Sequence, residues 1–136
     1  MIKGIAHICI GTSDLAATER FYCYGLGLTR GFNFVRKGQI IGFYLKAAEG
    51  VYVEVFKREK VVPEPDSPIS HLCLEVGDID DTVARLKANG YEPTGKILGA
   101  DQSWQAWVTD PAGVRIEFHQ YTPKSCQLTG VDCVLE

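Results

Sequence analysis

Two histidines and two glutamates occupy matched places along this chain, and together they offer a donor set for a metal ion. His7 and His71 each lie in a short apolar segment, and so do Glu54 and Glu117. A carboxylate in the middle of an apolar strand is costly to bury unless something pairs with it. Two imidazoles and two carboxylates suit a divalent transition ion. An octahedral ion held by these four side chains keeps two positions for water or substrate oxygens, which is typical of a catalytic site.

The same residue types also have an ordinary structural interpretation. A single histidine or glutamate in a strand is usually a solvated or hydrogen-bonded residue rather than a ligand. The repetition favours a ligand set here, because His7 lies 47 residues before Glu54 and His71 lies 46 residues before Glu117. Two cysteines stand near the histidines, at 9 and 73, and we expect them to be small apolar fillers rather than ligands.

The elements that must position these residues follow one pattern twice. In the first half we expect a helix from Asp14 to near Gly25 or Gly27, and strands at about 4–11, 29–36, 40–46 and 51–57. In the second half we expect a helix from Asp78 to about Asn89, and strands at about 70–77, 94–98, 104–109 and 114–121. Each half therefore reads βαβββ, and the chain contains an internal duplication.

The repeat sets the expected domain organisation. The first βαβββ module spans 1–57, a proline-rich linker spans 58–69, and the second module spans 70–121. The tail, 122–136, shows no clear period. We expect one domain of the α+β class, in which the two tandem modules pair into a half-open β-barrel cleft that brings the four ligands together.

Composition excludes several classes of function. The chain has 136 residues, a net charge of −3 and no basic patch, which argues against binding to nucleic acid or to anionic membranes. Its apolar runs are strand-sized, so we expect no membrane span. The five cysteines are odd in number and lack CxxC spacing. Together with an N-terminus that shows no secretory leader, this predicts a cytoplasmic protein.

Several segments resemble the vicinal oxygen chelate superfamily, the glyoxalase–bleomycin resistance–dioxygenase family. The segments that carry the resemblance are Ile5-Ala-His7, Ser13-Asp-Leu15, Phe21-Tyr22, Gly25-Leu-Gly-Leu28, Ser70-His71 and Asp110-Pro-Ala-Gly-Val-Arg-Ile-Glu117. The resemblance implies the paired βαβββ fold and a metal site formed by His7, Glu54, His71 and Glu117. The ion would be one divalent cation: Ni, Zn, Co, Mn or Fe.

The ligand set His/Glu/His/Glu is most similar to that of bacterial glyoxalase I, a lactoylglutathione lyase. In that family a ligating glutamate moves a proton next to a carbonyl through a metal-bound enediolate. The resemblance therefore implies a metal-dependent lyase or isomerase, in which the metal acts as a Lewis acid and glutamate as general base. Glu117 is the expected base, and Glu54 is its pseudo-symmetric catalytic partner.

The chain also departs from glyoxalase I at two positions that contact glutathione in that family. An Arg four residues after the first histidine is replaced by Gly11, and an Asn four residues after the first glutamate is replaced by Arg58. These changes argue against glutathione as co-substrate.

Five further residues are expected to line the substrate pocket: Tyr44, Phe56, Gln105, Trp107 and His119. Tyr44 lies ten residues before Glu54, and Trp107 lies ten before Glu117. Both also fit plain core packing. His119 shares a strand face with Glu117 and suits a proton shuttle or a hydroxyl-binding group. Gln105, Trp107 and His119 suggest a polar, hydroxylated or ring-shaped substrate.

Two other functions fit parts of this pattern. One is a metal-free protein that sequesters a small molecule, as the bleomycin-binding members of the family do. The other is an Fe(II) ring-cleaving dioxygenase, which would leave Glu54 off the metal and consume oxygen. In each case the partner is a small molecule. Exposed edge strands make a homodimer the expected assembly.

Overall fold

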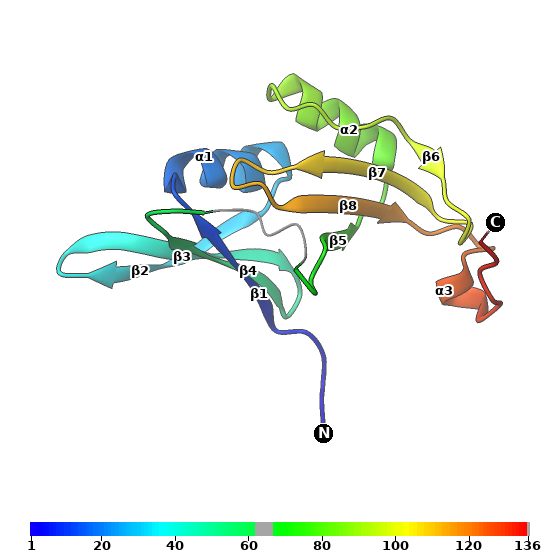
Figure 1. The fold of residues 1–136 in the computed structure, drawn as a ribbon, viewed down its shortest axis with the longest axis horizontal. Helices are drawn as coiled ribbons and strands as arrows, with labels where there is room; N and C mark the ends of the chain where they lie inside the picture. Colours follow the sequence, from blue (N-terminus) through cyan, green and yellow to red (C-terminus); the bar gives the residue numbers. More distant parts are fainter. Residues whose placement is uncertain (62–66, 136) are drawn as a thin grey trace. The chain divides into compact units, whose positions relative to one another are not determined.

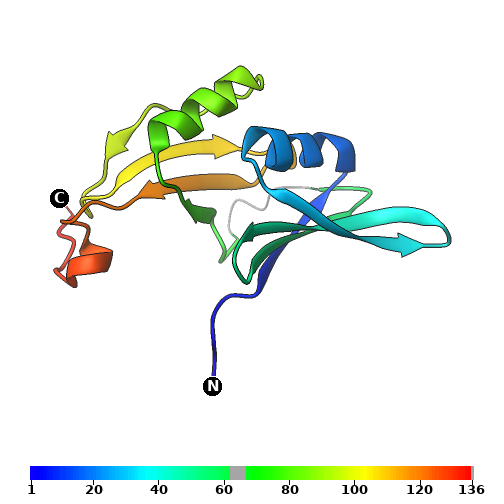
Figure 2. The same cartoon turned by 180° about the vertical axis from the view of Figure 1, so that it is seen from behind.

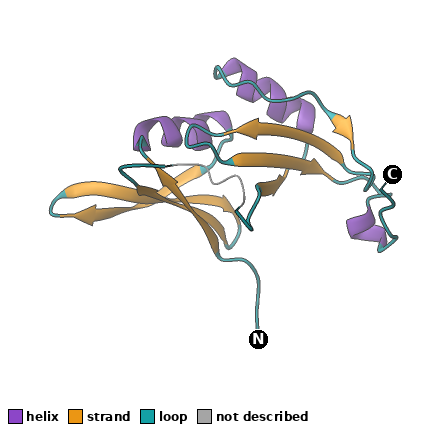
Figure 3. Ribbon diagram, viewed as in Figure 1, coloured by secondary structure: helices purple, strands orange, loops and turns teal. Residues whose placement is uncertain are grey.

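The computed structural model describes residues 1–61 and 67–135, and its elements repeat one order twice (Figures 1 and 3). The first module contains β1 (His7–Thr12), α1 (Leu15–Glu19), η1 (Arg20–Gly25), β2 (Thr29–Arg36), β3 (Gln39–Ala48) and β4 (Val51–Lys57). The second contains β5 (Leu72–Glu75), α2 (Ile79–Ala88), β6 (Ile97–Leu98), β7 (Trp104–Thr109) and β8 (Arg115–Gln120), followed by α3 (Cys126–Thr129). The predicted α+β class with two βαβββ modules is confirmed.

Each module forms its own four-stranded sheet with the same topology. The strand order is β1-β4-β3-β2 in the first sheet and β5-β8-β7-β6 in the second. The first strand of each module runs parallel to the last, and the other neighbours are antiparallel. The chain divides into two compact units, one built on the first module with Asp110–Val114 and one on the second module with the C-terminal segment.

The helices begin where the sequence supplies caps and cover one face of each sheet. Asp14 Oδ1 accepts a hydrogen bond from the Ala17 N–H, and Asp78 Oδ1 accepts one from the Asp81 N–H. Helix α1 contacts β4, and α2 contacts β7 and β8. Figure 2 shows α2 alongside these two strands from the opposite side. The buried apolar side chains include Phe21, Phe43, Val53 and Val55 in the first unit and Ile79, Leu86, Ile116 and Phe118 in the second.

The first helix differs from the predicted regular α-helix. After Glu19 it continues as a π-helical stretch, in which the Leu26 N–H donates to the carbonyl of Phe21 at 3.0 Å. The wider turn lets the adjacent Phe21 and Tyr22 both reach the core, where neither side chain is exposed. The 3.6-residue spacing of the sequence does not predict this widening.

Two predicted strands differ from their predicted bounds, and the tail, for which no element was predicted, contains a short helix. The strand predicted at 94–98 is limited to Ile97–Leu98. Ahead of it, the Thr94 N–H donates to the carbonyl of Trp107, and the Thr94 hydroxyl accepts from the Trp107 N–H. The strand predicted at 70–77 begins only after His71. The tail forms the short helix α3, and its buried Ser125 accepts a hydrogen bond from Ser103 Oγ.

The predicted linker at 58–69 is described in part, since residues 62–66 lie outside the described residues. Within the part of the chain that the structure describes, no helix combines the length and the apolar composition of a membrane span.

Candidate functional site

In the first unit, His7 and Glu54 meet on the sheet face opposite the core. The parallel register of β1 and β4 pairs Cys9 with Glu54, and the antiparallel register of β3 and β4 pairs Tyr44 with Glu54. Alternation along β4 buries Val53 and turns Glu54 to the other face. There, His7 Nε2 lies 3.5 Å from Glu54 Oε2. The histidine side chain is 41% exposed and the carboxylate 17%, so the pair is open to a ligand.

The second unit repeats this arrangement with closer contacts. Register pairs Cys73 and Trp107 with Glu117, as Cys9 and Tyr44 are paired with Glu54. His71 Nε2 lies 3.0 Å from Glu117 Oε2. The other carboxylate oxygen, Oε1, lies 2.9 Å from His119 Nε2. Glu117 is therefore held between two imidazoles, and it is only 8% exposed.

Both histidines of the predicted ligand set have the same orientation. His7 Nδ1 lies 2.8 Å from the Tyr44 hydroxyl, and His71 Nδ1 lies 2.8 Å from the Ser70 hydroxyl. Where the hydroxyl accepts a hydrogen bond from Nδ1–H, the ring is the tautomer whose Nε2 carries a free lone pair. In both modules Nε2 faces the glutamate. Each pair can therefore offer a divalent cation one imidazole nitrogen and one carboxylate oxygen.

The structure brings the predicted ligands together as two pairs, His7 with Glu54 and His71 with Glu117. These pairs belong to different compact units.

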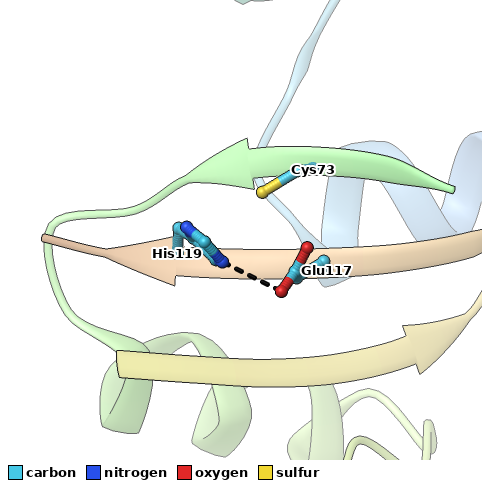
Figure 4. A group of neighbouring side chains, drawn as sticks. All are labelled: Cys73, Glu117 and His119. Carbon is cyan, nitrogen blue, oxygen red and sulfur yellow. Dashed lines mark hydrogen bonds and ion pairs between the residues drawn. The ribbon is translucent and has the colours of Figure 1, made fainter. Parts of the chain in front are cut away.

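The prediction that Cys9 and Cys73 are apolar fillers is wrong. Both are exposed, because β1 and β5 are edge strands and each cysteine faces the side that carries the glutamate. Partial desolvation of the sulfur, followed by the negative charge of Glu117, raises the pKa of Cys73 to about 12. Among the described residues, Cys73, Glu117 and His119 form one cluster whose ligand atoms all lie within 4.8 Å of one another (Figure 4).

The predicted pocket residues lie on the same sheet faces as the glutamates. The ring of Tyr44 packs edge-on against His7, and that of Trp107 packs edge-on against His71, with centroid distances of 5.6 and 4.9 Å. Both rings are half-buried, so neither is a core residue. Phe56 stacks on Phe34 at 4.4 Å. Gln105 turns toward the loop before β7 and donates to Asp101 Oδ1 at 3.4 Å.

Comparison with known proteins identifies the family. A family model described as the Glyoxalase/Bleomycin resistance protein/Dioxygenase superfamily matches residues 4–118. The chain belongs to this superfamily. The chain is 29% identical to the Uncharacterized protein YaeR of Escherichia coli (strain K12), over 88% of this chain and 97% of that protein.

Solved structures of the same fold include a glyoxalase family protein from Enterococcus faecalis, at 27% identity and a TM-score of 0.72. The match covers 86% of this chain and 97% of that one. The lactoylglutathione lyase of Agrobacterium tumefaciens matches with 21% identity and a TM-score of 0.66, over 90% and 96% of the two chains. At that identity the second likeness shows the fold alone.

Arg58 lies against Gly11, the position at which this chain lacks the arginine of glyoxalase I. A Cβ atom at Gly11 would lie 2.9 Å from Arg58 Cγ. Arg58 thus occupies the space that a side chain at position 11 would need, and its backbone N–H donates to the carbonyl of Thr12 at 2.7 Å. A cationic side chain is therefore present here, but it extends from the end of β4 rather than from β1.

The His7–Glu54 pair, called the first half-site from here on, has three aromatic neighbours that the sequence analysis did not single out. Phe32 stacks on Tyr44 at 4.8 Å, and Tyr52 lies 5.2 Å from the same ring. Phe34 packs edge-on against Phe32. Phe32 is 56% exposed, so this aromatic surface is accessible on one side. The period-2 spacing of Phe32 and Phe34 was the available signal, because it places both rings on one face.

Proposed function

We propose that this protein is a metal-dependent lyase or isomerase of the glyoxalase I type, with His7, Glu54, His71 and Glu117 as ligands of one divalent ion. The observation that carries the proposal is the duplicated orientation of the two histidines. In each module a hydroxyl binds Nδ1, and Nε2 faces the glutamate of the same module. If only one His–Glu pair had a role, and that role needed no metal, the other module would not need the same arrangement.

Glu117 is the proposed general base. It takes a proton from the hydroxyl-bearing carbon of the substrate and returns a proton to the neighbouring carbonyl carbon, while the hydroxyl proton passes to the former carbonyl oxygen. The reaction is therefore an isomerisation without an external oxidant. When bound, the metal ion supplies Lewis-acid stabilisation of the negative charge that develops on the substrate oxygens. His119 Nε2, at 2.9 Å from Oε1, holds the carboxylate in one orientation during both transfers.

The aromatic surface of the first unit indicates the substrate class. Phe32, Tyr44 and Tyr52 present stacked and tilted rings beside His7. Such a surface binds a flat ring through stacking. We therefore propose a hydroxy-carbonyl substrate that carries a ring. With Arg58 filling the space over Gly11, we do not expect glutathione to be required.

The direct experiment combines metal analysis with hydrogen exchange. Ring-bearing α-hydroxy ketones are incubated with the protein in D₂O, with and without glutathione, and loss of the C–H signal is followed by NMR. The proposal predicts exchange that depends on the metal and disappears in Glu117→Gln and His71→Ala. Folded, metal-free protein that is indifferent to both substitutions would exclude it.

A metal-free binding function is the second candidate, and the accessible aromatic surface is the observation that favours it. It predicts tight binding of a ring-bearing compound that is unaffected by chelators and by Glu117→Gln, but weakened by Phe32→Ala. Oxygen consumption, measured in the same samples, would instead indicate a dioxygenase. We further expect a cytoplasmic homodimer, and light scattering tests the dimer.

A further inference from the structure

We propose that the second module alone can hold a thiophilic divalent ion, such as Zn²⁺ or Cd²⁺, with Cys73, Glu117 and His119 as its ligands. This site shares Glu117 with the proposed function but uses no residue of the first module. It therefore stands whether or not the two half-sites act together.

The three ligand atoms are assembled by neighbouring strands. Cys73 on β5 is in register with Glu117 on β8, and His119 follows two residues later on the same face. Figure 4 shows Cys73 on the strand beside the one that carries His119 and Glu117, with its sulfur turned toward these two side chains. Bond lengths of about 2.0–2.3 Å place the donors of one ion roughly 3 to 4 Å apart. The observed 2.9 Å between His119 Nε2 and Glu117 Oε1, and the 4.8 Å limit for the cluster, need only small side-chain movements.

The donor types favour particular ions. A thiolate selects Zn²⁺ and softer cations over Mg²⁺ or Mn²⁺, and imidazole and carboxylate complete a mixed S, N, O set. Three protein ligands leave the fourth tetrahedral position open. Cys73 is exposed and has no disulfide partner, so an ion can reach it from solvent.

The first module provides an internal comparison. It has Cys9 in register with Glu54, but the residue two places after Glu54 is Phe56, whose ring stacks on Phe34. The third donor is therefore specific to the second module. The duplicated fold does not require a histidine at position 119, whereas a three-donor site does.

The experiment is a titration of the reduced, metal-free protein with Co²⁺, followed by absorbance. Thiolate bound to Co²⁺ gives an intense near-ultraviolet charge-transfer band that nitrogen and oxygen ligands do not give. We expect this band in the wild type and in the matched control Cys9→Ser, and its loss in Cys73→Ser and Cys73→Ala. His119→Gln should weaken Cd²⁺ binding at least about tenfold. Thermal unfolding curves verify that the variants are folded.

Two results would overturn the inference. One is a band that persists in both Cys73 variants, or its absence from the wild type. The other is loss of the band in Glu54→Gln, which would contradict a site confined to the second module. Glu54→Gln also separates this inference from the proposed function, because it should abolish catalysis while the charge-transfer band remains.

Discussion

Glu117 Oε1 lies 2.9 Å from His119 Nε2, and both residues are only 8% exposed. The opposite oxygen, Oε2, faces His71 Nε2 at 3.0 Å. The carboxylate proposed as base thus cannot rotate without losing one imidazole. The corresponding position beside Glu54 is Phe56, so the two glutamates differ in what fixes them although they share a register. Because Glu117 is fixed on both sides and Glu54 is not, this difference supports Glu117 rather than Glu54 as the proposed base.

Replacing His119 tests whether it positions the carboxylate. His119→Phe introduces the residue type that the first module has at position 56, and we expect kcat to fall about 10- to 100-fold, as for other residues that orient a ligand. KM should change much less. His119→Gln, whose amide can still donate to Oε1, should recover part of the rate. Equal loss in both variants, with KM raised in parallel, would indicate a role in substrate binding.

The hydroxyls on Nδ1 should control metal affinity. Tyr44→Phe and Ser70→Ala each remove the partner of one histidine Nδ1, and each should weaken metal binding about 10- to 100-fold. Tyr52→Phe is the matched control, because its ring lies beside Tyr44, whereas the hydroxyl that binds His7 Nδ1 is that of Tyr44. Competition with a chromophoric chelator measures the affinities. An affinity unchanged in both variants would contradict the assigned tautomer.

Tyr22 and Asp110 form a buried pair in the first unit. The Tyr22 hydroxyl donates to Asp110 Oδ2 at 2.8 Å, and Asp110 Oδ1 accepts from the N–H groups of Ala112 and Val114. Tyr22→Phe should lower the free energy of unfolding by about 1.5–3 kcal/mol, because the hydrogen bond reaches a carboxyl group that stays buried. Urea denaturation at neutral pH measures this loss, and a change within experimental error would contradict it.

The same pair predicts alkaline sensitivity. Burial, followed by the charge of Asp110, raises the pKa of Tyr22 well above its ordinary value of 10.0. The unfolded chain then loses the tyrosine proton at a lower pH than the folded protein does. The free energy of unfolding should therefore be constant below about pH 10 and fall as the pH rises above it. Tyr22→Phe should flatten that slope, and an unchanged slope would contradict the assignment.

The thiol of Cys73 should react slowly in the metal-free protein. Its pKa of about 12, against 9.0 for an ordinary cysteine, leaves little thiolate at neutral pH. Alkylation by iodoacetamide at pH 8 should be roughly a hundredfold slower than for an exposed thiol of normal pKa, and it should still be accelerating above pH 9. Peptide mass spectrometry resolves the rates. A rate that levels off near pH 9 would be inconsistent with this pKa.

The fold and the two half-sites follow from features that are visible in the sequence. The repeat places His7 on the first strand of its module and His71 just before the first strand of the other, and each glutamate lies on the last strand, which pairs in parallel with the first. Strand alternation also places His119 beside Glu117, as found. The strand order and the alternation along β8 could be predicted because register and period follow from the hydrophobic pattern of the strands, whereas the metal-binding role of these residues stays a prediction.

Other features depend on contacts that the sequence does not encode locally. Cys73 follows the pattern of a buried cysteine, but it lies on an edge strand and on the open face. The π-helical stretch coincides with the burial of the adjacent Phe21 and Tyr22, which the 3.6-residue period of the sequence does not predict. Ser70 acts on His71 through a side-chain hydrogen bond between adjacent residues, and such a bond has no periodic signature.

Elemental analysis of the purified protein tests the central claim most directly. The protein carries Cys73→Ser, which removes the thiolate site inferred above. It is loaded in turn with Ni, Zn, Co, Mn and Fe(II), freed of excess ion, and compared with the same protein that also carries Glu54→Gln or His7→Ala. The four-ligand proposal predicts one ion per chain in the Cys73→Ser protein, bound at least about a hundredfold more weakly in both first-module variants, with the fold intact by circular dichroism. A Cys73→Ser protein that retains no ion, or first-module variants that bind it as tightly, would contradict the proposal.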